Sequence, residues 1–210
     1  MKKRAFSLRV DADTKALVDM MSERVRAMGR LLDDLIDISR LSQKKLNLRK
    51  ENVRVKDILQ RSIAAVNEFV IDKTHTCQLE VSDHSMAIFA DPTRFEQIVV
   101  NLLKNAVKYS AQGSLVRIKA HRSGDRSVIS IKDNGIGISK ELIGRIFEPY
   151  VQADVKRAAS GGTGLGIGLW LTRMLVEMHG GSISARSEGE GKGSEFILQF
   201  PIHESTPVAL

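Results

Sequence analysis

Two asparagines, a lysine and a tyrosine follow one another at helical spacing near the middle of the chain. Asn101 and Asn105 are four residues apart, and Lys108 and Tyr109 lie about one turn further along, so that they share one face of a helix. Amide oxygens suit Mg²⁺, a lysine supplies a point charge for phosphate, and a tyrosine ring offers a flat surface to a base. The simpler interpretation is a set of solvated polar residues at a helix end. We expect a phosphate and metal site, because this many polar groups on a buried face are costly unless they have partners.

A second candidate is the glycine-rich stretch "GGTGLGIGLW" at residues 161–170. Glycines directly before a helix let backbone N–H groups approach a ligand, and the first amides of a helix have no internal partners. Together these features predict a phosphate cradle. The spacing is not GxxxxGK[ST], because no lysine follows, and it fits GxGxxG only loosely, because no strand leads directly into it. A flexible hinge is the alternative.

Two shorter motifs are ambiguous when each is taken alone. "DNGIGI" at residues 133–138 places an aspartate at a strand end, followed by glycines in a turn. It can present a carboxylate to an exocyclic amine, or it can be an ordinary turn. "GKGSEF" at residues 191–196 reads by itself as a hairpin loop.

The elements that must position these motifs follow from hydrophobic periodicity and turn residues. A long helix is expected over residues 14–41, with the heptad pattern of a dimerising or bundle-forming helix, and a polar linker over 42–53. Helices are also expected over 53–70, 92–110, 139–147 and 165–181, and strands over 77–82, 86–91, 114–121, 127–133, 182–188 and 194–201. Helices first and mixed elements later predict an α/β sandwich layer with a helical appendage.

Composition limits the class of protein. The 210 residues carry 42% hydrophobic and 27% charged residues and a net charge of +7, with a single cysteine, Cys77. No apolar run reaches the roughly 18–20 residues of a membrane helix, and no secretory leader pattern is present. Aromatic residues do not interleave with the basic ones, so we expect no nucleic acid and no membrane contact from this segment. The unpaired cysteine favours the cytoplasm.

In chain order, these segments resemble the catalytic ATP-binding domain of sensor histidine kinases, within the wider group that contains gyrase and mismatch-repair ATPases. "RFEQIVVNLLKNAVKYS" resembles the asparagine box of that family, and "DNGIGI", "GGTGLGIGL" and "GEGKGSEF" resemble its three glycine boxes. "RIFEPY" resembles the phenylalanine box, and the likeness covers residues 54–203 almost continuously. It implies an α+β fold, a two-layer α/β sandwich in which helices cover a mixed sheet. It also implies transfer of the γ-phosphoryl group of Mg-ATP to a histidine.

The resemblance implies a role for each motif. Asn105 would bind Mg²⁺, while Asn101 and Lys108 would be directed at the metal and the phosphates. Asp133 would accept a hydrogen bond from the adenine amino group, and residues 150–164 would form a mobile lid. The residues expected around ATP are Tyr109, Asp133, Gly135, Gly137, Ile138, Phe147, Thr163, Gly164, Leu165, Gly166, Gly168, Leu169 and Ser194. Among them, Phe147 would pack under the lid, the glycines of residues 164–168 would begin the phosphate-binding helix, and Ser194 stands where the family more often has threonine.

The front of the chain resembles the second helix of the dimerisation and phosphotransfer hairpin of these kinases. None of the five histidines lies in the setting of a phosphoacceptor, so the acceptor helix is expected on a longer chain or on a partner. The resemblance implies a division into residues 1–53, a partial hairpin helix with its linker, 54–205, the catalytic domain, and 206–210, a frayed tail. The expected partners are a second copy, through the N-terminal helix of the full-length protein, and a response regulator or histidine-containing domain.

Three other functions are compatible with parts of this pattern. An ATPase clamp of the gyrase type carries a glutamate four residues before the metal-binding asparagine, where this chain has Asn101, and an amide cannot take a proton from water. A nucleotide-dependent dimerisation module without kinase activity would keep the boxes. A protein serine kinase of the same nucleotide fold would lack the preceding hairpin helix.

Overall fold

The computed structural model describes residues 46–152 and 165–203, together with single positions between 14 and 36. The chain divides into two compact units, Met1–Lys45 and Leu46–Leu210, and each is considered by itself. The long helix predicted over 14–41 lies outside the described residues except for those single positions, and so does the tail predicted over 206–210. The division at residues 53 and 205 stays a prediction.

The second unit contains β1 (Glu51–Arg54), α2 (Val55–Ala65), α3 (Asn67–Asp72), β2 (Thr76–Val81), β3 (Ala87–Ala90), α4 (Pro92–Tyr109), β4 (Leu115–Ser123), β5 (Arg126–Lys132), α5 (Lys140–Ile143), α6 (Gly168–Met178), β6 (Ser182–Arg186) and β7 (Glu195–Pro201). Two expectations are corrected. The end of the expected linker forms β1, which pairs with β3 apart from the main sheet. The helix expected over 53–70 is two helices, because the backbone leaves helical geometry at Val66.

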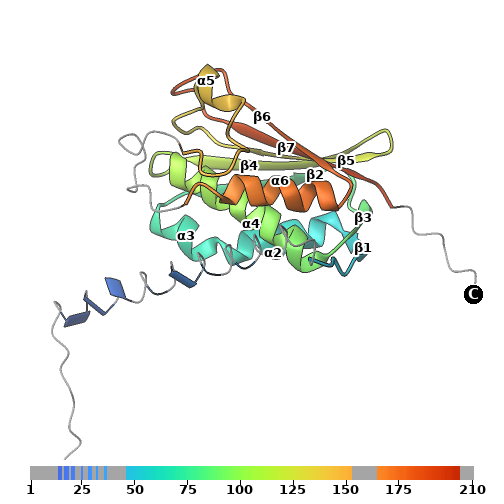
Figure 1. Ribbon diagram of the computed structural model, residues 1–210, viewed down its shortest axis with the longest axis horizontal. Coiled ribbons are helices and arrows are strands. Elements are labelled where there is room, and N and C mark those ends of the chain that lie inside the picture. The colour runs from blue at the N-terminus through green and yellow to red at the C-terminus, as the bar shows by residue number, and fades with distance from the viewer. Residues whose placement is uncertain are drawn as a thin grey trace, which may run out of the picture. The chain divides into compact units, whose positions relative to one another are not determined.

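The main sheet has five strands in the order β2-β4-β5-β7-β6. β2 runs parallel to β4, and every other neighbouring pair is antiparallel, so the sheet is mixed. Figure 1 shows α2, α4 and α6 together beneath one face of this sheet. The predicted two-layer α/β sandwich is confirmed for this unit.

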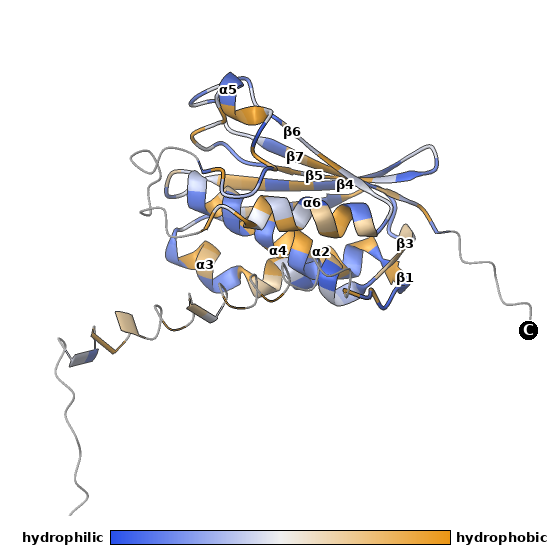
Figure 2. Ribbon diagram, in the orientation of Figure 1, coloured by the Kyte–Doolittle hydropathy of each residue, from blue (hydrophilic) through white to orange (hydrophobic). Residues whose placement is uncertain are grey.

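The core lies between the sheet and these helices. Phe95 of α4 and Phe200 of β7 are both fully buried and meet edge to face, with ring centroids 5.2 Å apart. Along β4 the buried side chains are Val116, Ile118 and Ala120, every second residue, as expected for a sheet with one covered face. Hydrophilic and hydrophobic residues alternate along the same helices and strands in Figure 2. The helix face that turns away from this core is therefore free to carry polar chemistry.

Candidate functional site

Helix α4 carries the predicted asparagine face. Its start is well defined, because the Asp91 carboxylate accepts hydrogen bonds from the backbone N–H groups of Thr93 and Arg94, both at 3.1 Å, and Pro92 occupies the first turn. One side of the helix is buried, and its members are Phe95, Ile98, Val99, Leu102, Leu103, Ala106 and Val107. The predicted polar residues Asn101, Asn105, Lys108 and Tyr109 are all half-buried. They therefore border the core without entering it, as a binding face requires.

Asn101 joins α4 to α6. Its Nδ2 donates to Oγ1 of the buried Thr172 at 2.8 Å. A Cβ added to Gly168 would lie 3.0 Å from Asn101 Oδ1, so the glycine is what lets the start of α6 approach this amide. The structure thus brings Asn101 close to Gly168, and it adds Thr172, a residue that the sequence analysis did not single out.

The start of α6 offers unpaired backbone N–H groups. The helix begins at Gly168, and Ile167 at its N-cap makes no side-chain hydrogen bond to cap it. Gly166 has a φ of +71°, outside helical geometry. The expectation that the glycines from 164 onward begin the helix is therefore corrected for Gly166, and Gly164 lies outside the described residues. The first amides of α6 remain available to an anion, beside Asn101.

Asp133 is buried at the end of β5. Its Oδ2 accepts from Ser194 Oγ at 2.6 Å, and its Oδ1 accepts from the backbone N–H groups of Gly135 at 2.7 Å and Ser194 at 3.3 Å. Burial raises the pKa of this carboxyl, and the hydrogen bonds from Ser194 and Gly135 partly offset that rise. The structure thus joins two of the predicted adenine-site residues, Asp133 and Ser194, directly.

The glycines after Asp133 lie against other backbone segments. A Cβ on Gly135 would collide with the carbonyl oxygen of Tyr109, and one on Gly137 with the carbonyl oxygen of Gly189. Ile136 N–H donates to Tyr109 O at 2.9 Å, so the end of α4 is fixed to this turn. Both positions therefore require glycine for the close approach of these backbone segments, and the placement of Gly135 and Gly137 near ATP stays a prediction.

Positive charge gathers at the end of α4. Lys108 Nζ lies 5.0 Å from the centre of the Tyr109 ring, a cation–π contact. Lys73, whose Nζ donates to the carbonyl of Val107 at 3.3 Å, has a lowered pKa, first because of burial and then because of the charge on Lys108. This end of the helix therefore favours an anionic ligand.

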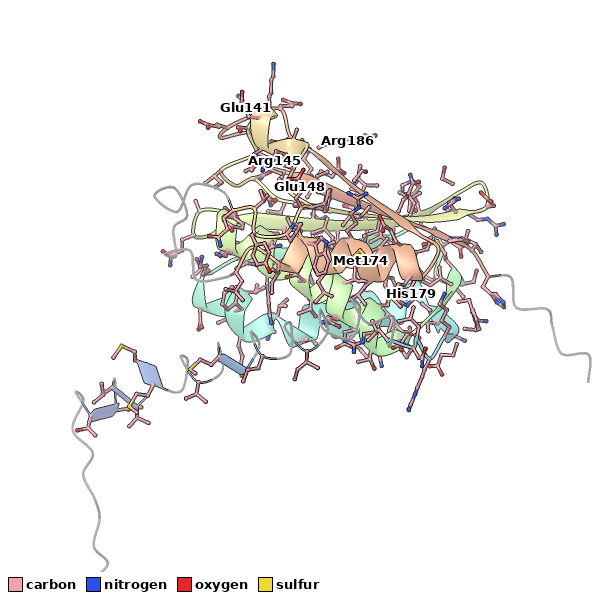
Figure 3. All side chains as sticks on the ribbon, in the orientation of Figure 1. Glu141, Arg145, Glu148, Met174, His179 and Arg186 are labelled. Atoms are coloured by element: carbon pink, nitrogen blue, oxygen red, sulfur yellow. The ribbon has the colours of Figure 1, made fainter. Side chains whose placement is uncertain are left out.

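The segment after α5 leads toward the predicted lid. Figure 3 labels Glu141, Arg145 and Glu148 around it, and Arg145 pairs with Glu148 at 3.0 Å. Phe147 packs edge to face on Phe196 of β7, with centroids 6.3 Å apart. Packing of Phe147 under a lid stays a prediction, because residues 153–164, Thr163 among them, lie outside the described residues.

Tyr150 and Gly166, which lie on either side of residues 153–164, are held close together. Tyr150 has a φ of +65°, which is unusual for a residue with a side chain, and its N–H donates to the carbonyl of Gly166 at 3.0 Å. Leu165 is 39% exposed and Leu169 is half-buried beside Gly168. The Tyr150–Gly166 bond therefore ties the end of the segment after α5 to the stretch that leads into α6.

The predicted residues therefore form two groups. One contains Asn101, Asn105 and the start of α6, and the other contains Asp133, Gly135 and Ser194. Tyr109 links them, since its ring contacts Lys108 and its carbonyl holds the turn after Asp133. Sequence reasoning missed Thr172, although a polar residue on the apolar face of "LWLTRMLVEM" is a signal that could have found it.

Residues 90–204, more than half of the chain, match the family described as histidine kinase-, DNA gyrase B-, and HSP90-like ATPase. The chain belongs to this family. It is 32% identical over 183 residues to the sensor histidine kinase YclK of Bacillus subtilis, covering 87% of this chain and 38% of YclK. It is 31% identical over 186 residues to the alginate biosynthesis sensor protein KinB of Pseudomonas aeruginosa, covering 89% of this chain and 30% of KinB. The chain thus spans about a third of the length of these relatives.

Solved histidine kinases share the fold. The full-length kinase ShkA in complex with AMPPNP superposes with a TM-score of 0.78 at 26% identity, covering 94% of this chain and 41% of ShkA. Histidine kinase ThkA in complex with the response regulator TrrA gives a TM-score of 0.65 at 17% identity, covering 96% of this chain and 54% of ThkA. The domain is the catalytic ATPase domain of the sensor histidine kinase type, and the predicted resemblance is confirmed.

The site suits ATP, the ligand of this family's ATPase domain. The amide of Asn105 has no hydrogen-bond partner among the described residues. Across those same residues, no group of three histidine, cysteine, aspartate or glutamate side chains is arranged to hold a metal. A metal here would depend on amide oxygens and phosphates, which suits Mg²⁺. Within the described chain, no helix is long and apolar enough to cross a membrane.

Proposed function

We propose that this chain binds Mg-ATP between the polar face of α4 and the start of α6, and that it transfers the γ-phosphoryl group to a histidine. The observation that carries the proposal is the contact of Asn101 with Gly168 and Thr172. It places an amide-rich helix face beside backbone N–H groups that have no partners of their own. Phosphoryl transfer depends mainly on positioning and charge neutralisation, and both are available here.

Each residue has a role in this proposal. Asn105 binds Mg²⁺, Asn101 and Lys108 face the phosphates, and the first amides of α6 hold a phosphate oxygen. Asp133, supported by Ser194, accepts from the adenine amino group, and Tyr109 packs beside the base. Mg²⁺ held by the Asn105 amide oxygen would supply positive charge that offsets the charge of the phosphates.

The contact of Asn101 argues against hydrolysis by a clamp-type ATPase. Such an enzyme needs a base for water at this position, and an amide cannot act as one. In addition, Asn101 Nδ2 already donates to Thr172. The relatives YclK and KinB are named as sensor proteins. Transfer to an acceptor is therefore the function that the site supports best.

The acceptor and partners belong to the same proposal. No histidine of this chain has the expected acceptor setting, so the acceptor is on a longer chain or on a second protein. The expected heptad residues Val18, Met21, Val25, Met28 and Leu32 are exposed, which favours a dimer through the N-terminal helix. We infer a response regulator as the downstream partner, and the cytoplasm, where ATP is available, as the location of this domain. The three-part division at residues 53 and 205 remains part of the proposal.

The test combines the protein with γ-labelled ATP, Mg²⁺ and a second protein that carries the acceptor helix of a related sensor kinase. We expect label on the second protein in a bond that is stable to alkali and labile to acid, as a phosphohistidine is. Asn105→Asp should abolish the labelling while the protein stays folded. Steady release of phosphate with no labelled protein would instead support the ATPase clamp, and failure to bind AMPPNP would overturn the proposal altogether.

A further inference from the structure

Ser187 lies on the loop that follows β6, outside every motif discussed above. Its Oγ accepts from the backbone N–H of Ile138 at 3.0 Å and from that of Gly189 at 3.3 Å. It donates to the carbonyl of Gly193 at 2.7 Å, with the carbonyl of Gly189 at 3.2 Å as a second acceptor. A hydroxyl has one proton and two lone pairs, so this side chain is used to capacity.

These bonds connect two segments of the expected adenine site. Residues 187–194 run beside the turn of residues 133–138, and backbone bonds join them: Gly191 N–H to Ile136 O at 2.7 Å, Gly193 N–H to Gly135 O at 3.1 Å and Asp133 N–H to Ser194 O at 2.9 Å. The Asp133–Ser194 side-chain bond closes one end of this pairing, and Ser187 closes the other.

The spacing of the two segments leaves little freedom for any other arrangement. A Cβ on Gly137 would collide with Gly189 O, and a Cβ on Gly193 with Asp133 O. Hydrogen bonds between the segments add to this close packing and fix their register. At the Ile138 end, the Oγ of Ser187 provides a side-chain hydrogen bond between the two segments. Its loss would free that end of the turn while the Asp133 end stayed closed.

We propose that Ser187 is a positioning residue for base selection, which acts through Ile138 and does not itself touch the nucleotide. This inference rests on the proposed function, which places adenine beside Asp133 and the turn of residues 135–138. The Asp133 carboxylate matches the amino group of adenine and repels the carbonyl that guanine carries at the same place. A turn held at both ends keeps that carboxylate and the backbone facing one base geometry. A turn released at Ile138 tolerates both bases.

The experiment measures calorimetric affinities for AMPPNP and GMPPNP, with Mg²⁺, in the wild-type protein and three variants. We expect Ser187→Ala to weaken AMPPNP binding about tenfold, the effect of one or two lost hydrogen bonds, while GMPPNP binding changes less than about twofold. The ratio of the two affinities should therefore fall. Ser187→Thr, which keeps the hydroxyl, should restore the ratio, and Ser184→Ala, an exposed serine on the same chain segment, should leave it unchanged.

Each outcome decides something. If Ser187→Ala weakened the binding of both nucleotides equally, the ratio of the two affinities would not change and Ser187 would have a purely structural role. That result would overturn the inference. Hydrogen exchange without nucleotide gives a second measurement: Ser187→Ala should speed the exchange of Ile138 N–H, and unaltered protection there would overturn the inference. If the wild-type protein bound neither nucleotide, the proposed function itself would fail, and this inference would fail with it.

Discussion

Replacing Gly193 by alanine is the sharpest test of how the adenine side of the site is built. Gly193 has a φ of +70° and lies against the backbone of Asp133, where an added Cβ would collide with a carbonyl oxygen. Gly191, two residues earlier, has a φ of +73°, and an added Cβ there meets nothing within 4 Å. An alanine at either position would have the same unfavourable positive φ, and only at residue 193 would its Cβ collide with a carbonyl oxygen. Gly191→Ala is therefore the matched control.

The expected magnitudes follow from these contacts. Alanine at a left-handed φ costs about 1–2 kcal/mol in the free energy of unfolding, and both variants should lose this much. In Gly193→Ala the loop must also move away from Asp133, which weakens two backbone bonds, Gly193 N–H to Gly135 O and Asp133 N–H to Ser194 O. At about 1 kcal/mol for each bond, the additional loss is about 2 kcal/mol.

Urea unfolding followed by tryptophan fluorescence measures this difference. Trp170 is the single tryptophan of the chain and lies in α6, so its signal reports on the catalytic unit. We expect Gly193→Ala to unfold with about 2 kcal/mol less free energy than Gly191→Ala and to bind AMPPNP more weakly. If the two variants agreed within about 0.5 kcal/mol, the close pairing of the two segments would not be a feature of the protein in solution.

Three further predictions test other contacts. Nucleotide affinity should fall as the pH drops through the raised pKa of Asp133, since only the carboxylate accepts from an amino group; Asp133→Asn should bind weakly at every pH. Burial lowers the pKa of His179 from its ordinary 6.5, with the Lys50 charge adding to this and the Leu175 carbonyl and Asp91 opposing it. As the pH falls, His179 is therefore protonated in the unfolded protein before it is protonated in the folded protein. The free energy of unfolding should be full above pH 6.5 and should fall below it, and His179→Gln should reduce this loss. Thr172→Val, which removes the partner of Asn101 Nδ2, should weaken Mg-AMPPNP binding about tenfold, whereas Thr172→Ser should not.

Contrary results are equally clear for these three. A pH-independent affinity in the wild-type protein would show that Asp133 does not bind the base as an acceptor. An unfolding free energy of the wild-type protein that is as high at pH 5.5 as at pH 7.5 would contradict a neutral, buried His179. Equal binding by the valine and serine variants at residue 172 would mean that the Asn101 amide needs no partner on α6.

Periodicity and motif order predicted the type of fold and the polar face of α4, because both depend on local spacing. The amphipathic pattern from Pro92 to Tyr109 and the alternation in β4 are confirmed. The pairing of β1 with β3 could not be predicted, because four-residue strands carry too little pattern to identify a partner. The break at Val66 was missed because the apolar spacing continues through it.

The site residues, like the fold, could be predicted only where they depend on local spacing. Spacing along one helix indicated that Asn101 and Asn105 share a face, but it could not show that Thr172 binds Asn101, because that contact joins residues 71 positions apart. The glycines of "DNGIGI" were recognised as special, but local sequence could not show that backbone from α4 and from the loop of residues 187–194 approaches them. Local sequence shows that space is needed, and only the fold shows what fills it.

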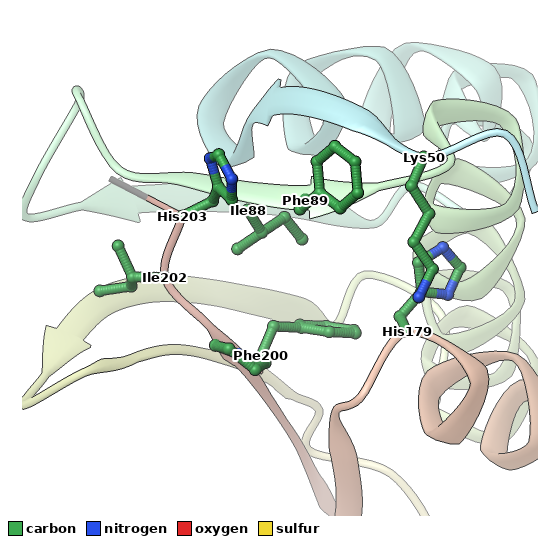
Figure 4. A pocket seen from close by; sticks show the side chains of 8 residues that line it. Lys50, Ile88, Phe89, His179, Phe200, Ile202 and His203 are labelled. Atoms are coloured by element: carbon green, nitrogen blue, oxygen red, sulfur yellow. The ribbon is translucent and has the colours of Figure 1, made fainter. Parts of the chain in front are cut away.

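The chain enters the catalytic unit at a point tied to two helices at once. Arg49 N–H donates to the Asp91 carboxylate at 2.9 Å at the start of α4, and Lys50 Nζ donates to the carbonyl of Met178 at 2.8 Å at the end of α6. His179 Nε2 accepts from Asp91 N–H at 3.0 Å, and Figure 4 shows its ring beside the Lys50 side chain. Because α4 and α6 run in opposite directions, these anchors lie at the ends remote from Asn105 and Gly168. A force applied at residues 49–50 would therefore act on the near ends of both α4 and α6. The opposite ends of these two helices carry the residues that are proposed to bind the triphosphate.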